Sequence, residues 1–172
     1  MEEKGMGKMV LSILVDDTAG VLSRVSGLFS RRGYNIDSLT VGETERPGIS
    51  RMTVVATGEE QILDQIKKQL AKLEDVKTII ELKDGESVRR ELILVKVAAT
   101  QKDRQAIIAV ADIFRAKIVD VSMESMIVEL TGNQAKLDAF IKLLEGFEVI
   151  AMVRTGITGL ARGVDLAQDI DD

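Results

Sequence analysis

The chain contains no cysteine and no histidine among its 172 residues. It therefore lacks thiolate nucleophiles, the usual general base near neutral pH, and the main nitrogen and sulfur ligands of metal ions. Without cysteine there is also no disulfide framework. Because the remaining residues form no convincing pair of nucleophile and base, we predict that this chain has no catalytic residues and no metal site.

Aromatic side chains, proline and positive charge are also scarce. Aromatic residues make up 3% of the sequence, Pro47 is its one proline, and the formal net charge is -5. Nucleic-acid binding needs basic surfaces and stacking platforms, so we expect no nucleic-acid partner. No apolar run approaches 18 residues and no basic and apolar leader precedes the first strand, so we expect a cytoplasmic protein with no membrane partner.

The residues that are present repeat one pattern of hydrophobic periods. In residues 8–83 the apolar positions alternate over 9–15, follow helical spacing over 21–29, and indicate strands over 36–42 and 51–57. A second helical stripe at 62–73 precedes a strand at 76–82. The order βαββαβ predicts an antiparallel sheet with helices on one face.

The same order returns in residues 88–155, after a polar break at 83–87. Strands are expected at 92–97, 119–123, 126–130 and 148–153, with a helix at 107–114 and another after the N-cap residue Asn133. The predicted fold class is thus α+β, with two ferredoxin-like βαββαβ domains, followed by a C-terminal tail at 156–172. Units this small have marginal cores, so we also expect association.

The first strand ends in a turn suited to the carboxylate of a free amino acid. A helix starting near Thr18 presents unpaired amides and the positive end of its dipole to an anion, with the N–H groups of Gly20, Val21 and Leu22 as donors. Glycine at position 20 suits this role, because a Cβ atom there would occupy the space that the ligand needs.

The ammonium group of the same ligand needs oxygen acceptors. Asp17 and Asn35 supply them if the second strand, or its copy in a symmetry mate, lies beside the turn. Val21, Leu22 and Ile36 are available as apolar lining. The candidate binding residues are therefore Asp17, Gly20, Val21, Leu22, Asn35 and Ile36.

Each of these residues also has a purely structural explanation. Asp17 or Thr18 can simply cap the helix, and Asn35 can be a turn residue after a helix-ending Gly33. The turn is informative only in combination with Asn35 and Ile36 at the start of the second strand of a βαββαβ unit.

The sequence resembles the ACT-domain family and, more narrowly, the small regulatory subunits of acetolactate synthase. The resemblance rests on GVLSRVSGLFSRRGYNIDSLTVG at 20–42, SRMT at 50–53, RTG at 154–156 and GLARG at 159–163. It implies that residues 8–83 are an ACT domain that binds an effector and dimerises. Two departures are Ala19, where ACT motifs commonly have proline, and Asp17, where this family often has asparagine.

The resemblance implies a non-catalytic partner of a catalytic large subunit, on which thiamine diphosphate, Mg and FAD are expected, with no cofactor on this chain itself. Such a subunit activates acetolactate synthase and makes it sensitive to inhibition by valine or another branched-chain amino acid, bound between the ACT domains of a homodimer. The alternative is a standalone ACT-domain sensor that regulates a different enzyme. The turn at 100–103 in the second unit has no glycine, so we expect no amino acid to bind there.

Overall fold

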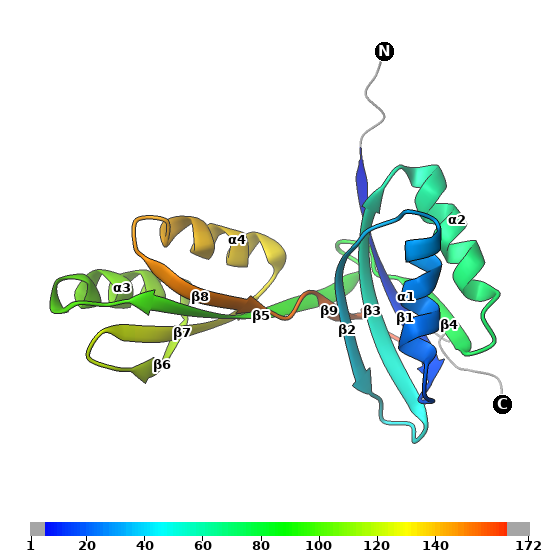
Figure 1. Cartoon of the computed structure of the whole chain (residues 1–172), viewed down its shortest axis with the longest axis horizontal. Coiled ribbons are helices and arrows are strands. Elements are labelled where there is room, and N and C mark those ends of the chain that lie inside the picture. Colours follow the sequence, from blue (N-terminus) through cyan, green and yellow to red (C-terminus); the bar gives the residue numbers. More distant parts are fainter. Residues whose placement is uncertain (1–5, 165–172) are drawn as a thin grey trace, which may run out of the picture. The chain divides into compact units, whose positions relative to one another are not determined.

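The computed structural model describes residues 6–164, which form two compact units (Figure 1). The first comprises the described residues up to Val88 together with those from Ile157 onward, and the second comprises Arg89–Gly156. Each unit contains its own apolar core. The units are therefore described one at a time.

The first unit contains a four-stranded antiparallel sheet with the strand order β2-β3-β1-β4. Its elements are β1 (Gly7–Asp16), α1 (Val21–Arg31), β2 (Ile36–Glu43), β3 (Ile49–Gly58), α2 (Glu60–Ala71) and β4 (Val76–Glu81). Helices α1 and α2 cover one face of this sheet (Figure 1). Strand β2 lies at one edge of the sheet.

Alternation along β1 places its odd-numbered apolar residues against the two helices. Ile13 is fully buried there, and it packs in one cluster with Phe29 of α1 and Ile66 of α2. Helix α1 ends where the sequence predicts, since Gly33 adopts a left-handed φ of 70° just beyond the last turn.

The second unit repeats this arrangement, with the strand order β6-β7-β5-β8. Its elements are β5 (Ser87–Ala98), whose first two residues belong to the first unit, α3 (Gln101–Phe114), β6 (Lys117–Val121), β7 (Ser125–Gly132), α4 (Gln134–Leu143) and β8 (Val149–Arg154). Phe114 and Phe140 meet edge to face in its core, with ring centroids 5.4 Å apart. The prediction of two ferredoxin-like βαββαβ domains is confirmed.

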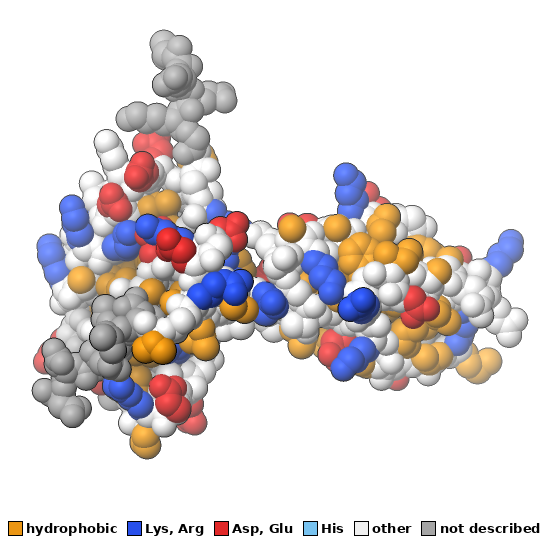
Figure 2. Space-filling view, turned by 180° about the vertical axis from the view of Figure 1, so that it is seen from behind, with side chains coloured by type: hydrophobic (Ala, Val, Ile, Leu, Met, Phe, Trp, Pro, Cys, Tyr) orange, Lys and Arg blue, Asp and Glu red, His pale blue; other side chains and the backbone are white. Residues whose placement is uncertain are grey.

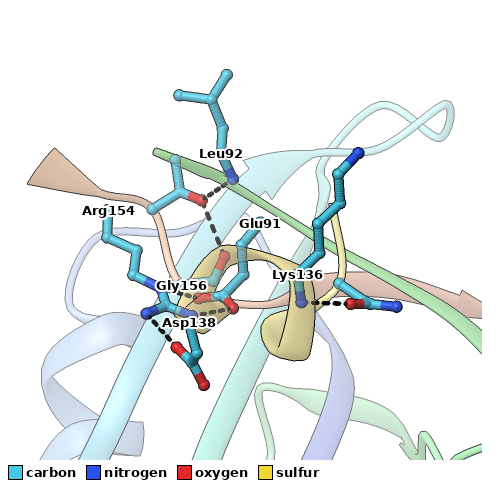
Figure 3. A network of polar contacts seen from close by, with 8 residues as sticks. Glu91, Leu92, Lys136, Asp138, Arg154 and Gly156 are labelled. Atoms are coloured by element: carbon cyan, nitrogen blue, oxygen red, sulfur yellow. Dashed lines mark hydrogen bonds and ion pairs between the residues drawn. The ribbon is translucent and has the colours of Figure 1, made fainter. Parts of the chain in front are cut away.

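A polar network ties α4 to the sheet of the second unit (Figure 3). The guanidinium of Arg154 donates to both carboxylate oxygens of Glu91, at 2.9 and 2.8 Å, and to Asp138 at 2.9 Å. At the start of α4 the Asn133 side chain accepts a hydrogen bond from the Lys136 amide at 2.9 Å, as its expected N-cap role requires. The buried Glu91 carboxylate is thus fully paired.

The expected C-terminal tail needs correction in its first part. Thr158–Ala161 forms a ninth strand, β9, which pairs with β5, and Ile157 before it packs against Val10, Val55 and Leu82 on the sheet face opposite the helices. The strand has four residues, too few to show a period, and its partner β5 begins at Ser87, inside the expected break. Residues 165–172 of the predicted tail lie outside the described residues.

We expect Ile157→Ala to lower the free energy of unfolding of the first unit by about 2–3 kcal/mol, because it deletes a buried side chain from a small cluster. Leu160→Ala in β9 is the matched control, since Leu160 is 57% exposed and should change stability by about 0.5 kcal/mol or less. Urea unfolding of both variants tests this. If the free energy of unfolding falls no further in Ile157→Ala than the small change expected for the control, Ile157 does not stabilise the core.

Candidate functional site

The turn between β1 and α1 is built around the left-handed backbone of Gly20. Its φ of 85° makes it the N-cap residue, so α1 begins at Val21 and not near Thr18 as the sequence predicts. A Cβ atom on Gly20 would lie 2.9 Å from Nη1 of Arg24. The left-handed backbone therefore favours glycine here before any ligand is considered, whereas the end of the flexible Arg24 side chain could move away from a Cβ atom.

Two backbone hydrogen bonds hold the turn from either side. The Asp17 amide donates to the carbonyl of Gly48 in the β2–β3 hairpin at 2.8 Å, and the Asp16 amide donates to the carbonyl of Asp75, just before β4, at 3.0 Å. The turn is thereby fixed to two loops that are distant in sequence.

The N-terminus of α1 can accept an anion. The N-cap residue Gly20 has no side-chain oxygen that could cap the helix, and the first turn of α1 contains no acidic residue. The Val21 amide has a long contact of 3.4 Å to the Thr18 carbonyl, whereas Leu22 and Ser23 lie where no preceding helical turn provides carbonyl acceptors. Of the three amides expected as donors, that of Val21 is engaged, whereas those of Gly20 and Leu22 donate to no backbone carbonyl of the described residues, and neither does that of Ser23.

Three carboxylates surround this turn, and two of them have cationic partners. Asp16 pairs with Lys77 at 3.3 Å, and Asp75 pairs with Nε of Arg24 at 2.5 Å. The hydrogen bond to Asp75 raises the pKa of Arg24, so this guanidinium stays charged. Across the described part of the chain, no ion pair or hydrogen bond engages the exposed Asp17 carboxylate, which can therefore receive an ammonium group.

The apolar candidates differ in their availability. Val21 is 4% exposed and its side chain belongs to the core, so it does not line a site as expected. Leu22 is 48% exposed beside the turn. Ile36 is partly buried against the core. Leu22 is thus the apolar side chain that the turn offers to a ligand.

Asn35 and Ile36 lie at the other end of the sheet. Asp16 is paired with Ile49, whereas Ile36 and Met9 are both paired with Ala56. Seven residues of β1 separate these two levels, about 23 Å at the usual rise of a strand. Figure 1 shows α1 running from one end to the other. One chain therefore brings Asp17, Gly20, Val21 and Leu22 together but does not bring Asn35 and Ile36 to them.

The corresponding turn of the second unit has a different end. Thr100 is the N-cap of α3, and its hydroxyl donates to Asp103 in the first turn at 3.0 Å. A carboxylate of the chain itself thus occupies the positive end of this helix, which disfavours a second anion.

Sequence reasoning missed Arg24, Asp75 and Gly48. The sequence gives a weak indication for Arg24, because a basic residue in the first turn of a helix is unfavourable for the helix dipole. The other two lie in loops whose approach depends on the fold. Among residues 6–164 there is no cluster of three acidic residues placed to hold a metal ion, and no helix long and apolar enough to cross a membrane.

Comparisons with known proteins cover nearly the whole chain. Residues 90–163 match the family described as small subunit of acetolactate synthase, and residues 11–78 match the AHAS small subunit-like ACT domain. A probable acetolactate synthase small subunit of Methanothermobacter thermautotrophicus is 49% identical over 90% of this chain and 92% of its own length. The acetolactate synthase small subunit of Mycobacterium leprae is 47% identical over 92% of this chain and 94% of its own.

A solved structure agrees with these matches. The crystal structure of the acetolactate synthase small subunit from Thermotoga maritima superposes with a TM-score of 0.84 and 40% identity, covering 92% of this chain and 99% of that one. The likeness therefore extends over both units and is not limited to an ACT domain.

Proposed function

Since this chain belongs to the family of acetolactate synthase small subunits, we propose that it activates the thiamine-diphosphate-dependent catalytic subunit and makes it sensitive to feedback inhibition by valine or another branched-chain amino acid. The effector binds at the β1–α1 turn of the first unit. The observation that carries this proposal is the division of the effector-binding residues between the two ends of one sheet.

A second copy of the chain unites the two halves of the site. Strand β2 is an edge strand, and antiparallel pairing of two β2 strands would extend the sheet across a twofold axis. The first residues of one β2 then lie beside the last residues of the other. Because β2 of each copy ends at the level of its own β1–α1 turn, Asn35 and Ile36 of one copy approach Asp17 and Gly20 of the other.

The chemistry of the two halves suits an amino acid. The turn supplies amides for the carboxylate, the unpaired Asp17 for the ammonium, and Leu22 for an aliphatic side chain. Asn35 adds an amide oxygen from the other copy. Because both copies contribute, the ligand favours one arrangement of the dimer. This differential affinity can shift the conformational equilibrium of the catalytic subunit, with a coupling free energy that is typically about 1–3 kcal/mol.

Exposed apolar surface supports the binding of a protein partner by the second unit. All four large apolar side chains of β8 are exposed, Val149, Ile150, Met152 and Val153. Figure 2 shows hydrophobic side chains gathered on this unit. Large apolar side chains left exposed on one unit are typical of protein interfaces, and the catalytic subunit is the partner that we propose.

Reconstitution tests the proposal. The chain is mixed with the catalytic subunit of the same organism, and acetolactate formation from pyruvate is measured with and without valine. We expect the two proteins to co-elute and the activity to rise when this chain is added. Valine should inhibit only when this chain is present, and the chain alone should form no acetolactate. Failure to co-elute or activate would favour the alternative, an ACT-domain sensor of a different enzyme.

Direct binding is tested by thermal unfolding of the chain alone with each of the twenty amino acids. A ligand at 100 times its Kd should add about 2.7 kcal/mol of stability. We expect the branched-chain amino acids to give the largest shifts. The absence of any response would contradict an effector site on this chain, whichever enzyme it regulates.

A further inference from the structure

Helix α1 has a cation in its first turn, where the helix dipole disfavours positive charge. Arg24 is the fourth residue of the helix, and its backbone amide donates to the Gly20 carbonyl at 3.0 Å. Side chains on a helix lean toward its N-terminus, so the guanidinium extends back over the turn. Nη1 of Arg24 accordingly lies close to Gly20, 2.9 Å from where a Cβ atom on this glycine would be.

Asp75 holds the guanidinium in that place. Its carboxylate accepts from Nε at 2.5 Å, and its side chain is 20% exposed, whereas that of Arg24 is 47% exposed. The Asp75 backbone is itself fixed to the turn through the Asp16 amide. This ion pair therefore presents the remaining N–H donors of Arg24 to the solvent at the mouth of the turn.

We propose that Arg24 binds the carboxylate of the effector and that Asp75 is its positioning residue. The inference rests on the proposed effector site and adds the group that distinguishes a free amino acid from derivatives that lack its carboxylate. A guanidinium forms strong charge-assisted hydrogen bonds with a carboxylate, and one held in advance by Asp75 loses less conformational freedom on binding. Asp75 also offsets the repulsion between Arg24 and the helix dipole.

The test compares valine with valinamide, which keeps the ammonium group and the side chain but lacks the negative charge. Calorimetry on the full-length chain gives Kd for both ligands in wild type, Arg24→Gln and Asp75→Asn. Lys67→Gln is the control, because it breaks an ion pair of similar exposure, with Glu81 at 2.8 Å, on α2. Circular dichroism establishes that each variant is folded.

We expect wild type to bind valine much more tightly than valinamide. In Arg24→Gln the Kd of valinamide divided by the Kd of valine should fall by about tenfold or more, because the variant loses a hydrogen bond to a charged group only with valine. Asp75→Asn should give a smaller fall, and Lys67→Gln should leave the ratio unchanged. A ratio that is unchanged in Arg24→Gln, with valine still bound, would overturn the role of Arg24 and leave the effector site standing. If wild type binds neither ligand, the effector site itself is contradicted.

Discussion

Gly20→Asp should abolish valine inhibition of the reconstituted enzyme. A carboxylate on Gly20 would lie roughly 4 Å from that of the effector, which costs about 4 kcal/mol at an effective dielectric near 20, close to a thousandfold in affinity. It would also pair with Arg24, since a Cβ atom on Gly20 lies 2.9 Å from Nη1. The measurement is acetolactate formation across a valine titration, and unchanged inhibition would refute the assignment of the turn.

Two further variants separate charge from backbone strain. Gly20→Ala introduces the strain of a left-handed φ and the contact with Arg24 without the charge, so we expect a weaker valine response, by about tenfold. Gly85→Asp adds the same charge at a φ of 81° in open space, in the loop between β4 and β5. Its valine response should match wild type. If Gly85→Asp also loses the response, the effect comes from charge or strain in general.

Local sequence pattern was sufficient wherever a residue acts through its own neighbours. The period-2 spacing of β1, the helical stripe of α1 and the cap at Asn133 are local patterns, and the structure has all three, with the odd-numbered apolar residues of β1 in the core beneath the helices and Val10 in the cluster on the other face. Strand β9 could not be predicted in this way, because its position depends on pairing with β5. The sequence predicts too early a start for α1, because the left-handed backbone of Gly20 delays the helix to Val21.

The candidate site illustrates the same limit. Sequence reasoning identified a turn able to hold a carboxylate, and the structure adds which groups remain available there: Asp17 is unpaired, Val21 is in the core and Leu22 is exposed. The pairing of Arg24 with Asp75 joins residues 51 positions apart, which no local pattern reports. Placing Asn35 required the register of β2 on β3.

Loss of the cation from the network in Figure 3 should strongly destabilise the second unit. In Arg154→Met the Glu91 carboxylate, whose side chain is 6% exposed, loses both hydrogen bonds from its partner. An uncompensated buried charge costs about 3–5 kcal/mol. We expect the free energy of unfolding to fall by this amount, measured by urea unfolding and by faster hydrogen exchange of the β5 and β8 amides.

The contribution of Arg154 to stability should not depend on pH near neutrality. The hydrogen bond to Glu91 raises the pKa of Arg154 above its usual value. The stability that a raised pKa provides is complete below the unfolded-state pKa and is lost only when the pH rises through the folded-state value. Because both values for arginine lie far above neutrality, Arg154 itself should add no pH dependence between pH 6 and 9.

A double variant identifies the stranded carboxylate as the cause. Combining Glu91→Gln with Arg154→Met removes both charges, so most of the lost stability should return, because a neutral pair avoids the cost of an unpaired buried ion. Asp138→Asn is the control, since Asp138 is 56% exposed and its pair with Arg154 should contribute about 1 kcal/mol or less. If the double variant is as unstable as Arg154→Met, the packing of the arginine side chain, and not the charge of Glu91, accounts for the loss.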